Sequence, residues 1–170
     1  MPLPAGVGYL ATDWGGFATT VATAAATLTG LLFIAVSINL KRILDYKPLP
    51  GRAAQTLFFF VLPLIFALLL VVPLQAQKAL GWEFIATAVV TWAAAQVVDR
   101  QTGRSEYEPQ WSWLVTRVLP MGGSCACVLV AGISLLASVG GGLYWLVPAT
   151  VLTIAAGLVN TWVLLIEIVR

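Results

Sequence analysis

The longest uncharged stretch of this 170-residue chain is residues 118–166, VLPMGGSCACVLVAGISLLASVGGGLYWLVPATVLTIAAGLVNTWVLLI. One helical crossing of a bilayer needs only roughly 20 apolar residues, so this stretch must fold back on itself. The three glycines at 140–142 mark the reversal, because glycine is a poor helix former and accepts the positive φ values that a turn requires. The stretch therefore predicts two transmembrane helices, at about residues 113–138 and 143–169.

The composition of the whole chain agrees with a membrane setting. Apolar residues make up 60% of it and charged residues only 9%, whereas about 25% of a typical soluble domain is charged. Three further runs carry little charge and are long enough to cross a bilayer; they predict helices at about residues 14–40, 53–75 and 79–98. Pro63 is expected to kink the second of these helices and Pro73 to end it, because proline removes a backbone donor. The predicted fold is all-α, a single domain of five transmembrane helices.

The basic residues predict how the bundle is oriented. With five spans, the segments 41–52 and 99–117 and the C-terminus share one side of the membrane. Eight of the nine Lys and Arg residues belong to these parts, and Lys78 is the exception: Lys41, Arg42, Lys47, Arg52, Arg100, Arg104, Arg117 and Arg170. Because cytoplasmic loops carry an excess of Lys and Arg, the N-terminus is expected outside and the C-terminus in the cytoplasm.

The polar residues argue against several classes of function. A net charge of +2 without a basic patch does not suit nucleic-acid binding. The chain has no histidine, the commonest metal ligand and the usual general base. Ser124 therefore lacks a residue to take its proton, and Cys125 and Cys127 would leave a helix about 200° apart, which disfavours a disulfide. We expect no catalytic residue, no metal site, no cofactor and no enzymatic activity.

The charged residues near the spans suggest structural roles. Asp13, Glu83 and Asp99 lie within a turn or two of a predicted interface, and the deep part of every span lacks an ionisable group. This pattern disfavours ion-coupled transport. Arg117 and Glu167 are expected at a similar depth, and we predict that they form an ion pair joining the last two helices; a substrate site is the alternative.

Small and polar residues recur along the predicted helix 14–40. They follow each other at steps of four, three, four, three and seven residues, with Ile34 in the remaining position: Gly16, Thr20, Thr23, Thr27, Gly30 and Ser37. Such a face gains from close backbone approach and from interhelical hydrogen bonds. One interpretation is tight packing against another helix of this chain or a second copy. The other is a pore lining, with Lys41 and Arg42 favouring anions at the cytoplasmic mouth.

Four amide side chains lie in the cytoplasmic halves of their predicted helices: Asn39, Gln55, Gln96 and Asn160. We expect them to converge, either as hydrogen-bonded bridges between helices or as a pocket for a polar ligand or a lipid head group. The phenylalanines of helix 53–75 are most simply lipid-facing or core bulk.

One segment resembles known proteins. Residues 30–40, GLLFIAVSINL, followed by Ile43-Leu44 and by 49–53, LPGRA, resemble small multi-pass bacterial membrane proteins. Some of these carry the label of modulator of a membrane-bound AAA-type quality-control protease. The resemblance covers residues 30–53 only and implies a bacterial inner-membrane location. It carries no catalytic residue over to this chain, and Arg52 in the turn is placed to meet lipid phosphates.

The sequence favours a non-catalytic membrane subunit, either self-assembling or an accessory of a larger membrane-protein complex. The alternative is a homo-oligomeric channel, anion-preferring, lined by the small and polar face of helix 14–40. The lipid bilayer and further copies or other membrane proteins are the expected partners, and nucleic acid is not. Copy number and the surroundings of Thr23 and Thr27 separate the two functions.

Overall fold

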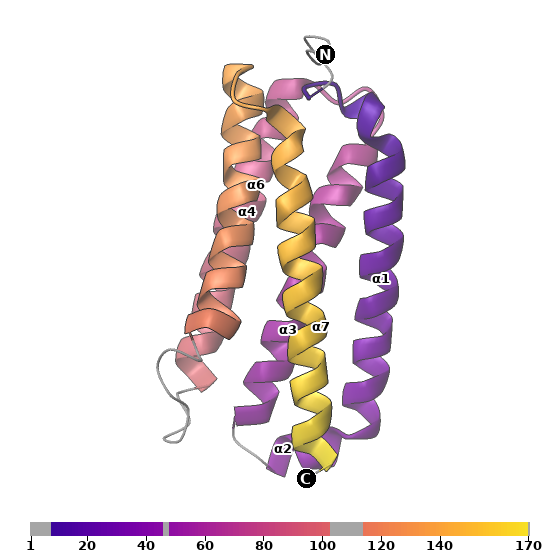
Figure 1. Ribbon diagram of the computed structural model, residues 1–170, viewed down its shortest axis with the longest axis vertical. Coiled ribbons are helices and arrows are strands. Elements are labelled where there is room, and N and C mark those ends of the chain that lie inside the picture. The colour runs from indigo at the N-terminus through magenta and orange to yellow at the C-terminus, as the bar shows by residue number, and fades with distance from the viewer. Residues whose placement is uncertain (1–7, 46–47, 103–113, 170) are drawn as a thin grey trace.

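The computed structural model describes residues 8–45, 48–102 and 114–169, and every regular element in these ranges is helical (Figure 1). Five helices are long and apolar enough to cross a membrane: α1 (Gly15–Ile38), α3 (Pro48–Val71), α4 (Gln77–Thr102), α6 (Leu119–Ala137) and α7 (Leu146–Val169). The shorter elements are η1 (Ala11–Trp14), α2 (Leu40–Asp45), the π-helical turn η2 (Leu114–Val118) and η3 (Gly142–Trp145). The predicted all-α fold, with five helices long and apolar enough to cross a membrane, is confirmed.

The region between the first two spans differs from the expected loop. The sequence placed a polar connection at 41–52, but α2 occupies 40–45 and α3 already begins at Pro48. Pro48 and Pro50 lie in the first turn of α3, where the backbone N–H groups have no intrahelical partner, so proline is tolerated there. The helix consequently starts about one turn earlier than its apolar run.

The five long helices form one bundle in which α3 is central. α3 contacts α1, α4 and α7, while α6 packs against α4 and α7. Half of the most apolar part of α3 is buried inside the protein, whereas only 17% of the corresponding part of α1 is buried. The ends of the chain lie at opposite ends of the bundle (Figure 1). α1 is therefore a peripheral helix that offers most of its surface to the surroundings.

The core is built around the phenylalanines of α3. Phe59, Phe60 and Phe66 are almost completely buried, and Phe58 is half-buried. Their large rings fill the space between α3 and its neighbours, so these residues are core bulk rather than a lipid-facing cluster. Pro63 is also buried inside α3, which continues past it to Val71 and ends two residues before Pro73.

Glycines allow two of the helix pairs to approach closely. A Cβ at Gly132 of α6 would lie 2.7 Å from the carbonyl oxygen of Gly81 in α4. A Cβ at Gly157 of α7 would lie 2.8 Å from Cζ of Phe60 in α3. Small residues at such contacts are typical of membrane helices, whose association depends on close packing.

The turn between α6 and η3 is the predicted glycine reversal. Gly140, Gly141 and Gly142 all have positive φ, at 89°, 100° and 56°. The segment before η1 packs onto this turn: the Leu143 amide donates to the Gly8 carbonyl at 2.7 Å, and the Gly141 amide donates to the Tyr9 hydroxyl at 3.1 Å. These bonds tie the start of the described chain to the connection between the last two spans.

Candidate functional site

The small and polar residues of α1 form its outward face, which we define as Gly16, Thr20, Thr23, Thr27, Gly30 and Ser37. All six are exposed, and a Cβ at Gly16 or Gly30 would meet no atom within 4 Å. The opposite side of α1 carries its buried residues, Ala18, Val21, Ala25 and Leu32. The described part of the chain does not cover the outward face.

The threonine hydroxyls of this face already have acceptors. Thr20 donates to the Gly16 carbonyl, Thr23 to the Thr19 carbonyl and Thr27 to the Thr23 carbonyl, each at 2.8 Å. Each hydroxyl oxygen keeps lone pairs that can accept a further hydrogen bond. The face can therefore lie against apolar groups without an unsatisfied donor, and it can also accept hydrogen bonds from a partner or from water.

The character of the outward face changes near Gly30. Large apolar side chains are exposed beyond this residue, at Leu31, Phe33, Ile34 and Ile38. Ser37 therefore lies between bulky residues, whereas residues 15–30 present only small side chains and threonines in their exposed positions. The shape of α1 therefore allows close approach of another helix only along residues 15–30, the first two thirds of α1.

The four amides lie on four different helices or helix ends. Asn39, the C-cap residue of α1, donates from Nδ2 to the Ala35 carbonyl at 2.9 Å. Gln55 is buried in α3, and Gln96 of α4 and Asn160 of α7 are half-buried. Since α3 contacts α1, α4 and α7, Gln55 lies on the helix that links the other three. Their convergence remains a prediction, as does a pocket for a polar ligand.

The predicted pair of Arg117 and Glu167 has its backbone in η2 and α7. The side chains of both residues lie outside the described part of the structure. The ion pair therefore remains a prediction.

The nucleophilic side chains are placed in helix contacts. The buried Ser124 hydroxyl donates to the Pro120 carbonyl at 2.7 Å. Cys125 is buried, Cys127 is half-buried, and both are free thiols. Within residues 8–45, 48–102 and 114–169, no group of three or more Cys, Asp or Glu side chains could hold a metal ion.

The sequence did not reveal two apolar grooves on the bundle. The α1–α3 groove, of about 240 Å³, lies between the end of α1, the helix α2 and the start of α3. The α4–α6 groove, of about 220 Å³, is lined by residues that include Trp92 and Gly122. The apolar residues Leu40, Ile43 and Leu44, at helical spacing after the first span, were the available signal for α2 and hence for the first groove.

No protein-family model, curated protein or solved structure matches this chain.

Proposed function

We propose that this protein is a non-catalytic multi-pass membrane subunit that self-assembles, or joins a larger membrane complex, through the outward face of α1. The observation that supports this proposal is that glycines and threonines are exposed along one face of α1. Gly132 and Gly157, by contrast, lie at contacts between helices of the same chain. Lipid tails gain little from such a face, whereas a second helix can approach its backbone closely. The experiment described below tests self-association.

We also propose an orientation and a location. Among the described residues, Lys41, Arg42, Arg52 and Arg100 belong to the end of the bundle at which α1 and α4 finish and α3 begins, and Lys78 belongs to the other end. The positive-inside rule then favours a cytoplasmic position for the first end, with the N-terminus outside. The resemblance of residues 30–53 to small bacterial membrane proteins suggests the bacterial inner membrane.

A channel is the second candidate, and the same face supports it. In a ring of copies, the outward faces could surround an axis and offer threonine oxygens to water. Lys41 and Arg42, just beyond the end of α1, would favour anions at one mouth. A channel needs a symmetric ring of several copies, whereas a packing face needs contact with only one partner helix.

Mass spectrometry of protein gently extracted from its membrane tests self-assembly. We expect the native chain to be oligomeric and Gly16→Leu/Gly30→Leu to shift it towards monomer, because leucine side chains block close helix approach. The matched control is Ala155→Leu, an exposed small residue on α7. A monomeric native chain, or equal effects of both changes, would contradict the proposal; an oligomer with a foreign subunit would support the accessory form.

Thiol accessibility separates the packing face from the pore. In a background with Cys125→Ala/Cys127→Ala, Thr23→Cys is compared with Leu68→Cys, which places a thiol on the exposed side of α3. A water-filled axis predicts that a membrane-impermeant thiol reagent labels position 23 much faster than position 68. Equal protection of both positions contradicts the channel and agrees with a dry contact.

A further inference from the structure

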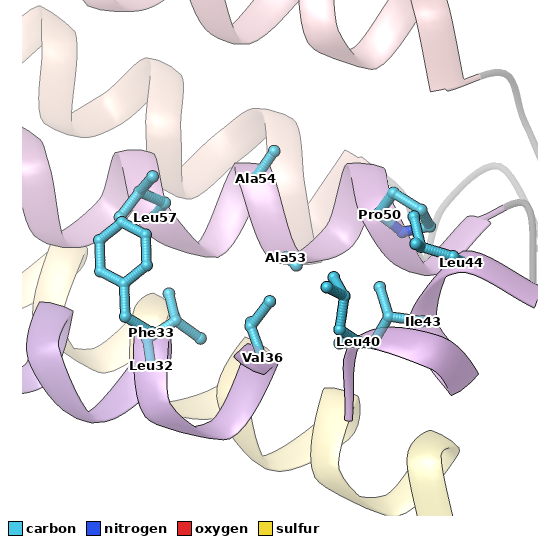
Figure 2. Close-up of a pocket in the computed structure, with 10 residues that line it drawn as sticks. All are labelled: Leu32, Phe33, Val36, Leu40, Ile43, Leu44, Pro50, Ala53, Ala54 and Leu57. Atoms are coloured by element: carbon cyan, nitrogen blue, oxygen red, sulfur yellow. The ribbon is translucent and has the colours of Figure 1, made fainter. Parts of the chain in front are cut away.

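The α1–α3 groove is walled entirely by apolar groups. Figure 2 shows Phe33 and Val36 of α1 and Leu40 of α2 pointing towards α3, which presents Ala53 and Leu57 to them. No lining residue carries a polar side chain. A polar ligand would lose its hydrogen bonds to water in such a site without replacing them, so the chemistry selects an apolar occupant.

The shape of the groove suits a flexible chain. Leu32, Ile43 and Ala53 are buried at its base, whereas Leu40 and Leu44 are 49% and 65% exposed at its edge. The groove is therefore open along one side to the surroundings of the bundle. Its volume of about 240 Å³ is several times the roughly 30 Å³ that a water molecule occupies in the liquid, which is room for a stretch of an acyl chain but not for a whole lipid.

Basic residues lie on both helices that form the rim. In the sequence, Lys41 and Arg42 follow the lining residue Leu40 in α2, and Arg52 precedes the lining residue Ala53 in α3. At about 100° per residue, these three side chains leave their helices beside or opposite the lining face, so it is their length that lets them reach round to the rim. Lys41 and Arg42 are exposed and Arg52 is half-buried. Among the described residues of α2, Asp45 is the only acidic one, so this helix carries a net positive charge. Arg42 and Arg52 also make interactions within the chain, but a guanidinium has five N–H donors and can hold a phosphate in addition.

We propose that the α1–α3 groove binds an anionic phospholipid, with part of an acyl chain between α1 and α3 and the phosphate at Lys41, Arg42 and Arg52. The pairing of an apolar groove with a cationic rim at the end of the spans matches the two parts of such a lipid. The α4–α6 groove provides an internal comparison, since Trp92, Gly122 and its other lining residues lie away from any basic side chain in the sequence. The lining residues Leu32 and Val36 lie on the side of α1 away from the outward face, so this proposal does not depend on self-assembly.

Native mass spectrometry of the purified chain with equal amounts of dioleoyl phosphatidylglycerol and dioleoyl phosphatidylcholine tests the proposal. We expect the wild type to retain the anionic lipid severalfold better. Lys41→Gln/Arg42→Gln should abolish the preference, whereas Lys78→Gln, which removes the basic residue from the other end of the bundle, should leave it unchanged. Equal retention of both lipids by the wild type, or an equal loss in the Lys78→Gln control, would overturn the proposal.

Filling the groove separates the acyl-chain site from a simple surface charge. Ala54→Phe should lower retention of the anionic lipid while keeping every basic residue, and Ala126→Phe in the α4–α6 groove is the matched control. If Ala54→Phe does not fold, Leu44→Gln at the exposed edge makes the groove polar and should have the same effect. Wild-type retention in a folded groove variant overturns the acyl-chain site.

Thermal unfolding distinguishes the lipid from a free anion. A ligand that binds the folded state raises the midpoint of unfolding, so phosphatidylglycerol should raise it more than phosphatidylcholine does. Inorganic phosphate alone should leave the midpoint unchanged. An equal rise with inorganic phosphate would show an anion site and contradict the lipid proposal.

Discussion

Two sets of glycines in this protein have opposite surroundings. Gly81, Gly132 and Gly157 lie where helices of the same chain touch, and a Cβ at any of them would come within 3.0 Å of a neighbouring atom. Gly16 and Gly30 lie on the outward face of α1, where a Cβ would meet nothing within 4 Å. Small residues in a membrane helix therefore indicate that another element can approach closely, but they do not identify that element. Within the described chain, Gly81, Gly132 and Gly157 contact a neighbouring helix, whereas Gly16 and Gly30 do not.

The difference has an energetic consequence. Lipid tails are as apolar as leucine, so helices in a bilayer are held together by packing and hydrogen bonds rather than by the hydrophobic effect. Adding a methyl group at an internal glycine should therefore lower the stability of the single chain, whereas adding one on the outward face should not. Glycine-to-alanine changes at four positions measure this contrast, and equilibrium unfolding in mixed detergent micelles, followed by the fluorescence of the seven tryptophans, is the common readout.

The largest effect is expected for Gly132→Ala. Its Cβ would lie 2.7 Å from the Gly81 carbonyl oxygen and 2.8 Å from Cγ1 of Ile85. Because the first of these atoms belongs to the backbone of α4, the two helices must move apart, and we expect the free energy of unfolding to fall by about 3 kcal/mol. An unchanged free energy of unfolding would show that α4 and α6 are not packed this closely.

Gly157→Ala should have the next largest effect. The atoms that its Cβ would meet all belong to the ring of Phe60, which is 1% exposed and has little room to turn. We expect the free energy of unfolding to fall by about 2 kcal/mol. Since one ring is responsible, the double variant Gly157→Ala/Phe60→Leu should be more stable than the two separate losses predict. If the losses in the free energy of unfolding of the two single variants simply add in the double variant, the strain does not arise from the contact with Phe60.

Much of the fold could be predicted from the sequence because the membrane imposes a length on every span. The uncharged stretch 118–166 and the three glycines inside it predicted the last two helices and their reversal, and the structure has both. The early start of α3 could not be predicted in the same way. Pro48 and Pro50 are typical of turns, but proline also suits a first helical turn, and only tertiary contacts decide between the two.

The sequence predicted which residues of α1 share a helix face but not what surrounds that face. The spacing of Gly16, Thr20 and Thr23 predicted a common face, and those residues do share one. The spacing of residues along one helix does not show which way a face of that helix points relative to the other helices. It therefore could not show that this face points outward. The α1–α3 groove was missed for a related reason. It depends on α2, and three apolar residues at helical spacing in a six-residue segment are a weak signal for a helix.

Gly81→Ala should have a smaller effect than the first two changes. Its Cβ would approach the Gly132 carbonyl oxygen and Cγ and Cδ2 of Leu136, each at 3.0 Å. Two of these atoms belong to a side chain that can move, so we expect a loss of about 1 kcal/mol in the free energy of unfolding. A loss larger than that of Gly132→Ala would reverse the order and show that α4, rather than α6, is the constrained partner.

The smallest effect on the single chain is expected for Gly30→Ala. The open space around this residue removes the steric penalty, and alanine loses less backbone entropy than glycine, so the free energy of unfolding should stay the same or rise by up to about 1 kcal/mol. Oligomer dissociation, measured on the same variant, then identifies what covers the outward face. If a second copy packs against Gly30, the added methyl group should weaken the oligomer although the monomer is no less stable. Unchanged dissociation would indicate that position 30 faces lipid, and a stability loss like that of Gly81→Ala would mean that another part of the chain covers the face.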